Sequence, residues 1–247
     1  MAEWIENIHA RFILNFIKDD RYTFMLNGFV ETIKITFFAI ILGLVLGTVT
    51  AVIRASYDTT HTTKYGSVGQ CIIQVMLWVL NLIAKVYLTV IRGTPTLLQL
   101  LIIYFVIFSS VNINKTVVAV LAFGINSGAY VAEIVRSGIM SVDRGQFEAG
   151  RSLGFGYIPT MCYIILPQAV KNILPAIGNE FIVLLKETSV SGYIAIQDLT
   201  KGADIIRSQT YDAFMPLIGA AIIYLVCVVI LSCGVSALER RLRVNER

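Results

Sequence analysis

Charged residues are scarce in this sequence of 247 residues, since Asp, Glu, Lys and Arg together make up only 15% of it. Soluble globular domains carry about 25% charged and about 45–50% apolar residues. Here 56% of the chain is apolar, and the mean hydropathy is +0.75. This composition excludes a disordered chain, a collagen or coiled-coil rod and a disulfide-stapled secreted domain, and it predicts an integral membrane protein.

Residues that commonly bind metals are also few. The two histidines are His9 and His61, and the four cysteines lie in apolar stretches without a Cys-x-x-Cys spacing. We therefore expect no metal site, and we expect the cysteines to pack as small hydrophobic residues. The net charge of +4 comes without a block of basic residues suited to nucleic acid, so no nucleic-acid partner is expected.

Two motifs of catalytic chemistry are missing as well. The sequence contains no Gly-x-x-x-x-Gly-Lys-Ser/Thr phosphate loop and no His-Glu-x-x-His pair. A chain without a phosphate loop cannot supply an ATPase of that class itself. We expect that the chain is not an enzyme and that it holds no cofactor.

Long uncharged runs are present instead, and they predict five membrane-spanning helices, because a helix needs about 20 apolar residues to cross the hydrocarbon core. Four uncharged runs cover residues 35–53, 93–114, 116–132 and 213–238, and a further apolar run at 172–185 is interrupted only by Pro175 and Glu180. The run at 152–170 is apolar but contains Pro159 and Pro167, so we expect it to be broken before the fourth span begins.

The remaining uncharged run, residues 65–84, holds Gln70, Gln74 and Asn81 and is separated from the next run only by Lys85 and residues 92–95. That gap is too short for an antiparallel return. We expect an interfacial helix that leads into a span at about 82–108, kinked at Pro95. The alternative is a sixth span, in which residues 65–84 cross the membrane on their own.

Basic residues predict the orientation, because Lys and Arg in short loops stay on the cytoplasmic side. Five spans with the C-terminus inside place the N-terminus outside and most basic residues at the inner side. The expected inner residues are Arg54, Lys64, Lys85, Arg92, Arg136, Arg144, Arg151, Lys171, Arg240, Arg241, Arg243 and Arg247. The expected outer ones are Lys115, Lys201 and Arg207.

The chain thus divides into an amphipathic outer segment at 1–24, a transmembrane domain at 25–241 and a cytoplasmic tail at 242–247. Apolar residues from Trp4 to Ile17 recur at steps of three and four, as in a helix on a membrane face. Glycine pairs four residues apart, Gly43/Gly47 and Gly124/Gly128, predict close packing between helices.

The segment from Arg136 to Gly156 is too polar for a span. Ser141 or Asp143 can cap a short helix that covers residues 144–153 and ends at Gly154. A short helix on the cytoplasmic face suits docking to a soluble partner. Many interhelical loops also contain short helices, so the pattern alone leaves a simple linker open.

These residues carry a resemblance. Glu148-Ala149-Gly150, Gly154 and Ile164-x-Leu166-Pro167 resemble the EAA signature of ATP-binding-cassette (ABC) importer permeases, although that family usually has Ala where Gly150 stands. Other motifs resemble the polar amino-acid permeases of the histidine, glutamine and arginine type over about residues 27–241. They are Arg92-Gly93-Thr94-Pro95 with Gln99, residues 128–139, Pro167-Gln168-Ala169 and residues 185–189.

The resemblance implies an all-α fold, the five-transmembrane-helix core of a type I ABC importer permease, in the cytoplasmic (inner) membrane of a prokaryote. It implies that a loop at about 138–157 docks to ATPase subunits that bind ATP and Mg, through Glu148, Ala149, Gly150 and Gly154. It further implies an extracytoplasmic amino-acid-binding protein and a second permease subunit, either the same chain or a paralogue.

Ionisable residues at membrane depth are rare and usually face a cavity. Glu180 and Glu187 are two helical turns apart, whereas Glu133 has Arg136 one turn away and is expected to form a local ion pair. The family resemblance implies a substrate site near the middle of the membrane. Its expected residues are Glu180, Glu187, Ser191, Gly93, Thr94, Ser127 and Tyr130.

An acid at Glu180, with Glu187 nearby, favours a cationic amino acid such as arginine, lysine or histidine, carried by alternating access. One alternative is a permease for neutral polar amino acids such as glutamine or cystine. Another is an ion-coupled secondary transporter that uses the same acids, although the motifs show no inverted repeat. A non-transporting scaffold is the third, but it would need neither buried acids nor a coupling loop.

Overall fold

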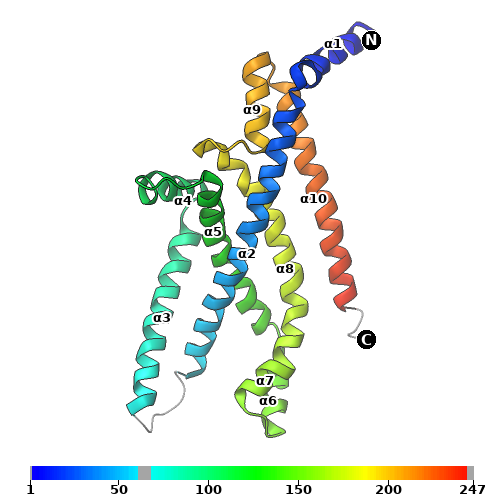
Figure 1. The fold of residues 1–247 in the computed structure, drawn as a ribbon. Helices are drawn as coiled ribbons and strands as arrows, with labels where there is room; N and C mark the ends of the chain where they lie inside the picture. Colours follow the sequence, from blue (N-terminus) through cyan, green and yellow to red (C-terminus); the bar gives the residue numbers. More distant parts are fainter. Residues whose placement is uncertain (1, 61–67, 244–247) are drawn as a thin grey trace. The chain divides into compact units, whose positions relative to one another are not determined.

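The computed structural model describes residues 2–60 and 68–243, and these ranges are almost entirely helical, without a strand (Figure 1). The expected all-α class is confirmed. The longer helices are α1 (Ala2–Phe12), α2 (Tyr22–Thr60), α3 (Val68–Gly93), α5 (Lys115–Met140), α6 (Arg144–Ser152), α8 (Leu166–Glu187), α9 (Leu199–Thr210) and α10 (Phe214–Arg243). Shorter turns are η1 (Ile13–Ile17), η2 (Lys18–Asp20), α4 (Thr96–Ile102), η3 (Ile103–Ile107), α7 (Tyr157–Thr160), η4 (Met161–Ile165) and η5 (Thr188–Ile194).

Five helical segments in the described ranges are long and apolar enough to cross a membrane, which confirms the expected number. They are Tyr22–Asp58, Ile72–Gly93, Lys115–Met140, Tyr157–Ile194 and Phe214–Leu242. Residues 61–67 and 244–247 lie outside the described residues, and so do the expectations for Lys64 and for most of the tail.

The second span differs from the expected one. The prediction of a kinked span at 82–108, preceded by an interfacial helix, is wrong, because α3 is one continuous helix that ends at Gly93. Asn81 is buried and Gln74 is partly buried seven residues earlier, so these polar side chains share the inner face of α3. Its other face is apolar and exposed, which is the pattern of a spanning helix rather than an interfacial one.

This correction concerns two basic residues. Lys85 lies within the candidate span, and Arg92 lies in the last turn of α3. Arg92 nevertheless contacts Glu133 and lines a pocket with Arg54, and the side of the membrane on which Lys85 and Arg92 lie stays a prediction.

The fourth candidate span is longer than the expected 172–185. Pro159 lies in the first turn of α7, where its missing N–H is not needed. The wider turn of η4, a π-helix, precedes Pro167 at the start of α8, and only Pro175 lies inside that helix. The prolines therefore redirect the chain without ending the helical segment Tyr157–Ile194.

The chain divides into two compact units, which are described separately. The first comprises residues 1–39, 96–123 and 182–232. Its core contains Met25, Leu199, Ala203, Ile206 and Ala220, and Phe16 of the N-terminal segment packs against this cluster. A Cβ atom at Gly28 would clash with the backbone of Asp198, and one at Gly202 would clash with the backbone of Phe24, so the two glycines let α2 and α9 approach closely.

The second unit comprises residues 40–95, 124–181 and 233–247. Within it, α2 and α5 cross at the predicted glycines. A Cβ atom at Gly47 would lie 2.6 Å from Val131 Cβ, and one at Gly124 would lie 2.6 Å from a methyl group of Leu42. The close packing expected of both glycine pairs is confirmed.

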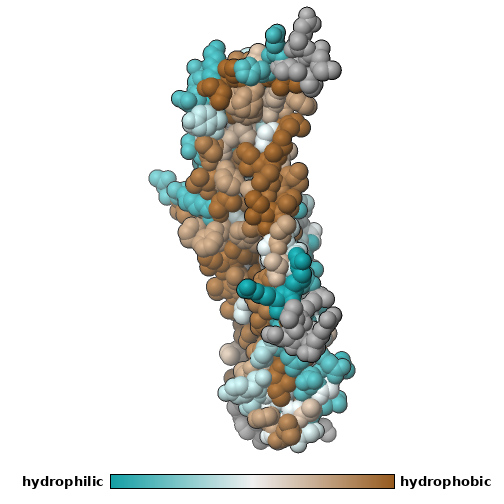
Figure 2. All heavy atoms as spheres, turned by 90° about the vertical axis from the view of Figure 1, so that its right-hand side faces the viewer, coloured by the Kyte–Doolittle hydropathy of each residue, from teal (hydrophilic) through white to brown (hydrophobic). Residues whose placement is uncertain are grey.

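Apolar side chains cover much of the surface, as Figure 2 shows for the side on which α10 lies. In the first unit, α10 exposes a row of large apolar residues, namely Ile218, Ile222, Leu225, Val226, Val229 and Ile230. Such a surface is suited to lipid or to other membrane helices rather than to water.

Candidate functional site

Glu180 of α8 and Ser127 of α5 form a defined polar contact between two of the expected substrate-binding residues. The Ser127 hydroxyl donates a hydrogen bond of 2.8 Å to Oε1 of Glu180, and both residues belong to the second unit. Ser127 is fully buried beside Gly43, where an added Cβ would lie 3.0 Å from Ser127 Oγ. The close α2–α5 packing therefore holds the serine hydroxyl toward the carboxylate.

Tyr130, one turn beyond Ser127, belongs to a second polar group in the same unit. The Arg92 guanidinium carbon lies 5.6 Å from the centre of the Tyr130 ring, within the range of a cation–π contact. Arg92 Nη1 also lies 3.8 Å from Glu133 Oε2, and Arg136 Nη2 lies 2.5 Å from Glu133 Oε1. The expected local ion pair between Glu133 and Arg136 is confirmed, whereas the contribution of Arg92 from α3 was not predicted.

Gly93 and Thr94 lie at the turn between α3 and α4. The Thr94 hydroxyl donates a hydrogen bond of 2.8 Å to the Val90 carbonyl oxygen and so closes the end of α3. No atom lies within 4 Å of the position that a Cβ on Gly93 would occupy, so this part of the turn is open. Binding of a substrate carboxylate at this turn stays a prediction.

Glu187 and Ser191 lie in the first unit. The Thr96 side chain of α4 hydrogen-bonds the Glu187 carboxylate, and the positive charge of Lys186 attracts this carboxylate. Ser191 is fully buried, and its hydroxyl donates to the Thr188 carbonyl oxygen within the same 3-10 turn. Both residues already have protein partners, and their role in substrate binding stays a prediction.

A basic pocket of about 510 Å³ in the second unit was not predicted. It is lined by Arg54 of α2 and by Lys85, Leu88, Thr89, Arg92 and Gly93 of α3. The spacing of Lys85, Thr89 and Arg92 places them on one helical face. A basic face could therefore have been predicted from the sequence if residues 72–93 had been assigned to one helix.

No group of three or more His, Cys, Asp or Glu side chains suited to a metal ion occurs among the described residues. The carboxylates, guanidinium groups and hydroxyls described above can bind polar or charged groups of a ligand.

The short helix of the predicted coupling loop is present as α6. Asp143 caps its N-terminus, since its Oδ1 accepts a hydrogen bond of 2.6 Å from the Gly145 N–H. The helix ends at Ser152, and Gly154 follows with φ of +86°. The predicted cap and the predicted end of this helix are confirmed, and Asp143 rather than Ser141 is the capping residue.

The two glycines of this loop have different structural roles. At Gly154 no atom lies within 4 Å of the position that a Cβ would occupy, so its positive φ is the constraint. Gly150 is buried, and a Cβ there would lie 2.8 Å from side-chain atoms of Thr160 and Ile164. Gly150 therefore lets α6 pack directly on α7 and η4.

The remaining predicted coupling residues, Glu148 and Ala149, are exposed. Leu153 is 78% exposed, and Ile158 is 71% exposed. Leu153 lies in the polar loop and Ile158 lies in the first turn of the fourth candidate span, so the two form an apolar surface at the end of that span, where a soluble protein can cover it.

The sequence matches the family model described as "Binding-protein-dependent transport system inner membrane component" over residues 67–244. It is 39% identical over 225 residues to the arginine transport system permease ArtQ of Bacillus subtilis, covering 90% of this chain and 94% of that protein. It is 37% identical over 170 residues to the glutamine transport system permease GlnP of Escherichia coli, covering 68% of this chain and 78% of that protein.

Solved structures agree with these matches. A chain from a crystal structure of an amino acid ABC transporter with histidines is 43% identical and superposes with a TM-score of 0.77, covering 92% of this chain and 98% of that one. A chain of the MetNI methionine ABC transporter superposes with a TM-score of 0.68 at 17% identity, covering 91% of this chain and 99% of that one, and it shows the fold alone.

These matches extend over most of the sequence and agree with the five candidate spans and the capped loop helix. The fold is that of a type I ABC importer permease, in a multi-pass membrane protein. The chain belongs to the family of inner-membrane permease components of binding-protein-dependent transport systems, in the group that resembles amino-acid permeases.

Proposed function

We propose that this chain is the permease subunit of an ATP-driven importer that carries cationic amino acids such as arginine, lysine or histidine by alternating access. The observation that carries the choice of substrate charge is the carboxylate of Glu180, which lies in a candidate spanning helix and is oriented by Ser127. An ionised acid at the centre of a span costs roughly 2.5–3.5 kcal/mol on insertion scales. A cationic substrate offsets part of that cost whenever it is bound.

The relatives support an amino-acid substrate but differ in its charge. The Bacillus subtilis relative is named for arginine, and the Escherichia coli relative is named for glutamine. A neutral polar amino acid such as glutamine or cystine is therefore the competing substrate. In that case the carboxylate of Glu180 would accept hydrogen bonds from an amide instead of pairing with a positive charge.

Coupling to ATP hydrolysis is assigned to α6. Its exposed Glu148 and Ala149 and the neighbouring apolar Leu153 are suited to a groove in a separate ATPase subunit that binds ATP and Mg. The capped N-terminus and the glycine-terminated C-terminus hold the helix in one conformation, so movement of the partner can be transmitted instead of lost in a flexible loop.

The assembly would contain a second permease subunit, either the same chain or a paralogue, and an extracytoplasmic binding protein, in the cytoplasmic membrane of a prokaryote. The tail of α10 would lie inside and the N-terminus outside. A cysteine introduced at the exposed Ser236 should resist a membrane-impermeant thiol reagent in intact cells. Labelling of this cysteine from outside would reverse the orientation.

Uptake by the reconstituted transporter, with its ATPase and binding protein, tests the substrate charge. Glu180→Gln should reduce arginine and lysine uptake about tenfold to hundredfold, since a charge-assisted hydrogen bond contributes about 1.5–3 kcal/mol, and should affect glutamine much less. Asp204→Asn changes a half-buried, ion-paired carboxylate on α9; it is the matched control and should leave uptake of both classes unchanged. Unchanged arginine uptake by Glu180→Gln would favour the neutral substrate.

A further inference from the structure

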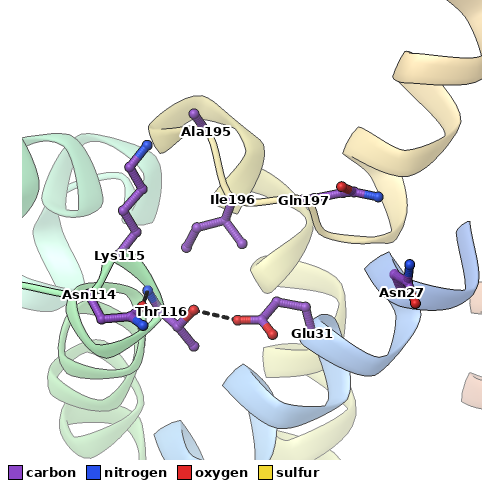
Figure 3. A pocket seen from close by; sticks show the side chains of 8 residues that line it. All are labelled: Asn27, Glu31, Asn114, Lys115, Thr116, Ala195, Ile196 and Gln197. Carbon is purple, nitrogen blue, oxygen red and sulfur yellow. Dashed lines mark hydrogen bonds between the residues drawn. The ribbon is translucent and has the colours of Figure 1, made fainter. Parts of the chain in front are cut away.

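A polar pocket of about 380 Å³ lies in the first unit, at the starts of α2 and α5 and beside the segment that follows η5 (Figure 3). Its charged side chains are Glu31 of α2 and Lys115 of α5, and its amides include Asn27, Asn114 and Gln197. Its volume falls in the usual range for pockets that bind small molecules. None of these residues was predicted to bind a ligand.

The carboxylate of Glu31 is fixed in place. The Thr116 hydroxyl donates a hydrogen bond to Oε1, and Lys34 Nζ lies 3.2 Å from Oε2. Asn114 caps α5 by accepting a hydrogen bond of 2.8 Å from the Thr116 N–H, and this cap positions Thr116 toward Glu31. A carboxylate has about four acceptor positions, so Glu31 can accept a further donor from the pocket.

Lys115 is the opposite charge of the pocket. Its ammonium nitrogen lies 5.9 Å from the centre of the Tyr104 ring, and among residues 2–60 and 68–243 no carboxylate forms an ion pair with it. As the first residue of α5, it also adds positive charge to a helix end that is already positive. An anionic group bound beside Lys115 would interact favourably with both.

We propose that this pocket binds the zwitterionic backbone of a free amino acid. The α-ammonium group donates to Glu31, the α-carboxylate pairs with Lys115, and the amides of Asn27 and Gln197 supply neutral hydrogen bonds. The pocket lies at the start of α5, whereas the coupling loop follows the end of the same helix.

The choice of an amino acid as ligand rests on the proposed transport function. The pairing of one carboxylate with one ammonium group also fits a salt-bridging segment of a partner protein, and the experiment separates these two occupants.

The test uses the whole transporter in lipid nanodiscs, with its four native cysteines replaced by alanine and one cysteine introduced at Ala195. Ala195 is exposed and lines the pocket. Arginine and glutamine should both slow the reaction of this cysteine with a thiol reagent. Arginine methyl ester lacks the carboxylate and N-acetylarginine lacks the α-ammonium group, so neither should protect. A control cysteine at Ser208, which is exposed on α9 outside the pocket, should not be protected.

Glu31→Gln and Lys115→Met should each raise the half-protecting amino-acid concentration roughly tenfold to hundredfold. Arg207→Met removes an exposed cation outside the pocket and should leave the half-protecting concentration unchanged. Glu180→Gln should leave protection intact, which separates this site from the membrane-depth one even if uptake fails.

Three outcomes would overturn the proposal. The first is that arginine and glutamine do not protect the cysteine at position 195. The second is that the ester or the N-acetyl compound protects it as well as arginine does. The third is that the amino-acid-free binding protein alone protects it. The last would assign the pocket to protein docking.

Discussion

Arg11 and Asp212, which are 201 positions apart in the sequence, form a two-point ion pair. Arg11 Nε lies 2.9 Å from Oδ2 of Asp212, and Arg11 Nη2 lies 2.6 Å from Oδ1. The buried Asn15 donates a hydrogen bond of 2.9 Å to the same carboxylate, and Asp212 also caps α10 through the Phe214 N–H. This contact fixes the N-terminal segment to the junction between α9 and α10.

Asp212→Asn should loosen the N-terminal segment, because the amide cannot accept both Arg11 donors. The hydrogen bond from Arg11 lowers the pKa of Asp212 below its usual value. The contact therefore adds stability above a pH of about 4 and is lost only as the pH falls through the lowered pKa. Proteolysis before Tyr22 should be faster in Asp212→Asn than in Asp19→Asn, an exposed ion-pair control. Equal cleavage rates would contradict this role.

Asp198 should make the stability of the protein depend on pH in the direction opposite to that of the Arg11–Asp212 contact. It is fully buried at the start of α9, and burial raises its pKa from 3.8 to about 6, although backbone N–H groups of Lys201 and Gly192 donate to it. Between about pH 4 and 6 the native state keeps a proton that the unfolded state has released. The free energy of unfolding should therefore fall as pH rises through this window, by roughly 3 kcal/mol, and then level off.

Thermal unfolding in detergent at pH 4.5 and 6.5 measures this effect. Asp198→Asn keeps an oxygen to accept the Lys201 N–H but cannot ionise, so its melting temperature should depend less on pH than that of the wild type. Asp204→Asn, on the same helix, should retain the wild-type dependence. An identical dependence in Asp198→Asn and the wild type would exclude Asp198 as its source.

Substitutions in the predicted coupling loop should distinguish the effect of backbone strain at Gly154 from the effect of a lost surface contact at Glu148. Gly154→Val forces a β-branched residue into a positive φ and should destabilise the loop by about 1–2 kcal/mol, whereas Gly154→Asn should cost less. Glu148→Arg changes only an exposed side chain and should leave the fold intact. Both Gly154→Val and Glu148→Arg should lower substrate-stimulated ATPase activity of the assembled transporter. Wild-type stimulation in Glu148→Arg would remove that residue from the interface.

Gly47 and Gly234 form a matched pair for helix packing. An added Cβ at Gly47 would lie 2.6 Å from Val131 Cβ and 2.8 Å from the Gly128 carbonyl oxygen, whereas no atom lies within 4 Å of that position at Gly234. Gly47→Ala should destabilise the protein by about 1–3 kcal/mol. Gly234→Ala should be neutral or stabilising by up to about 1 kcal/mol, since alanine favours a helix. Equal melting temperatures for the two variants would contradict the close α2–α5 packing.

Local sequence rules predicted the parts of the fold that depend on neighbouring residues. Asp143 and Gly154 define the ends of α6 through capping and backbone conformation, both of which can be inferred from a few adjacent residues. The second span was missed because Gln74 and Asn81 made a spanning helix look too polar. Only the packing of Asn81 inside the second unit shows that these side chains avoid lipid.

Contacts between distant residues could not be predicted in this way. Glu180 could be chosen as a site residue from its charge and depth, but its hydrogen bond to Ser127 depends on the crossing of separate helices. The pocket at Glu31 and Lys115 was missed for a similar reason. No role was predicted for Glu31, and Lys115 was expected only as a basic residue of an outer loop, whereas the structure brings both to one cavity through α2 and α5.

The missing side chain at Gly150 has a mechanical consequence. Because the backbone of α6 at Gly150 rests directly on the side chains of Thr160 and Ile164, position 150 adds no side chain of its own between the predicted coupling helix and the first turns of the fourth span. A displacement imposed on α6 by a partner must therefore be shared by α7 and η4. A larger residue at position 150 would have to displace Thr160 or Ile164, and it would separate α6 from the helix turns that receive this displacement.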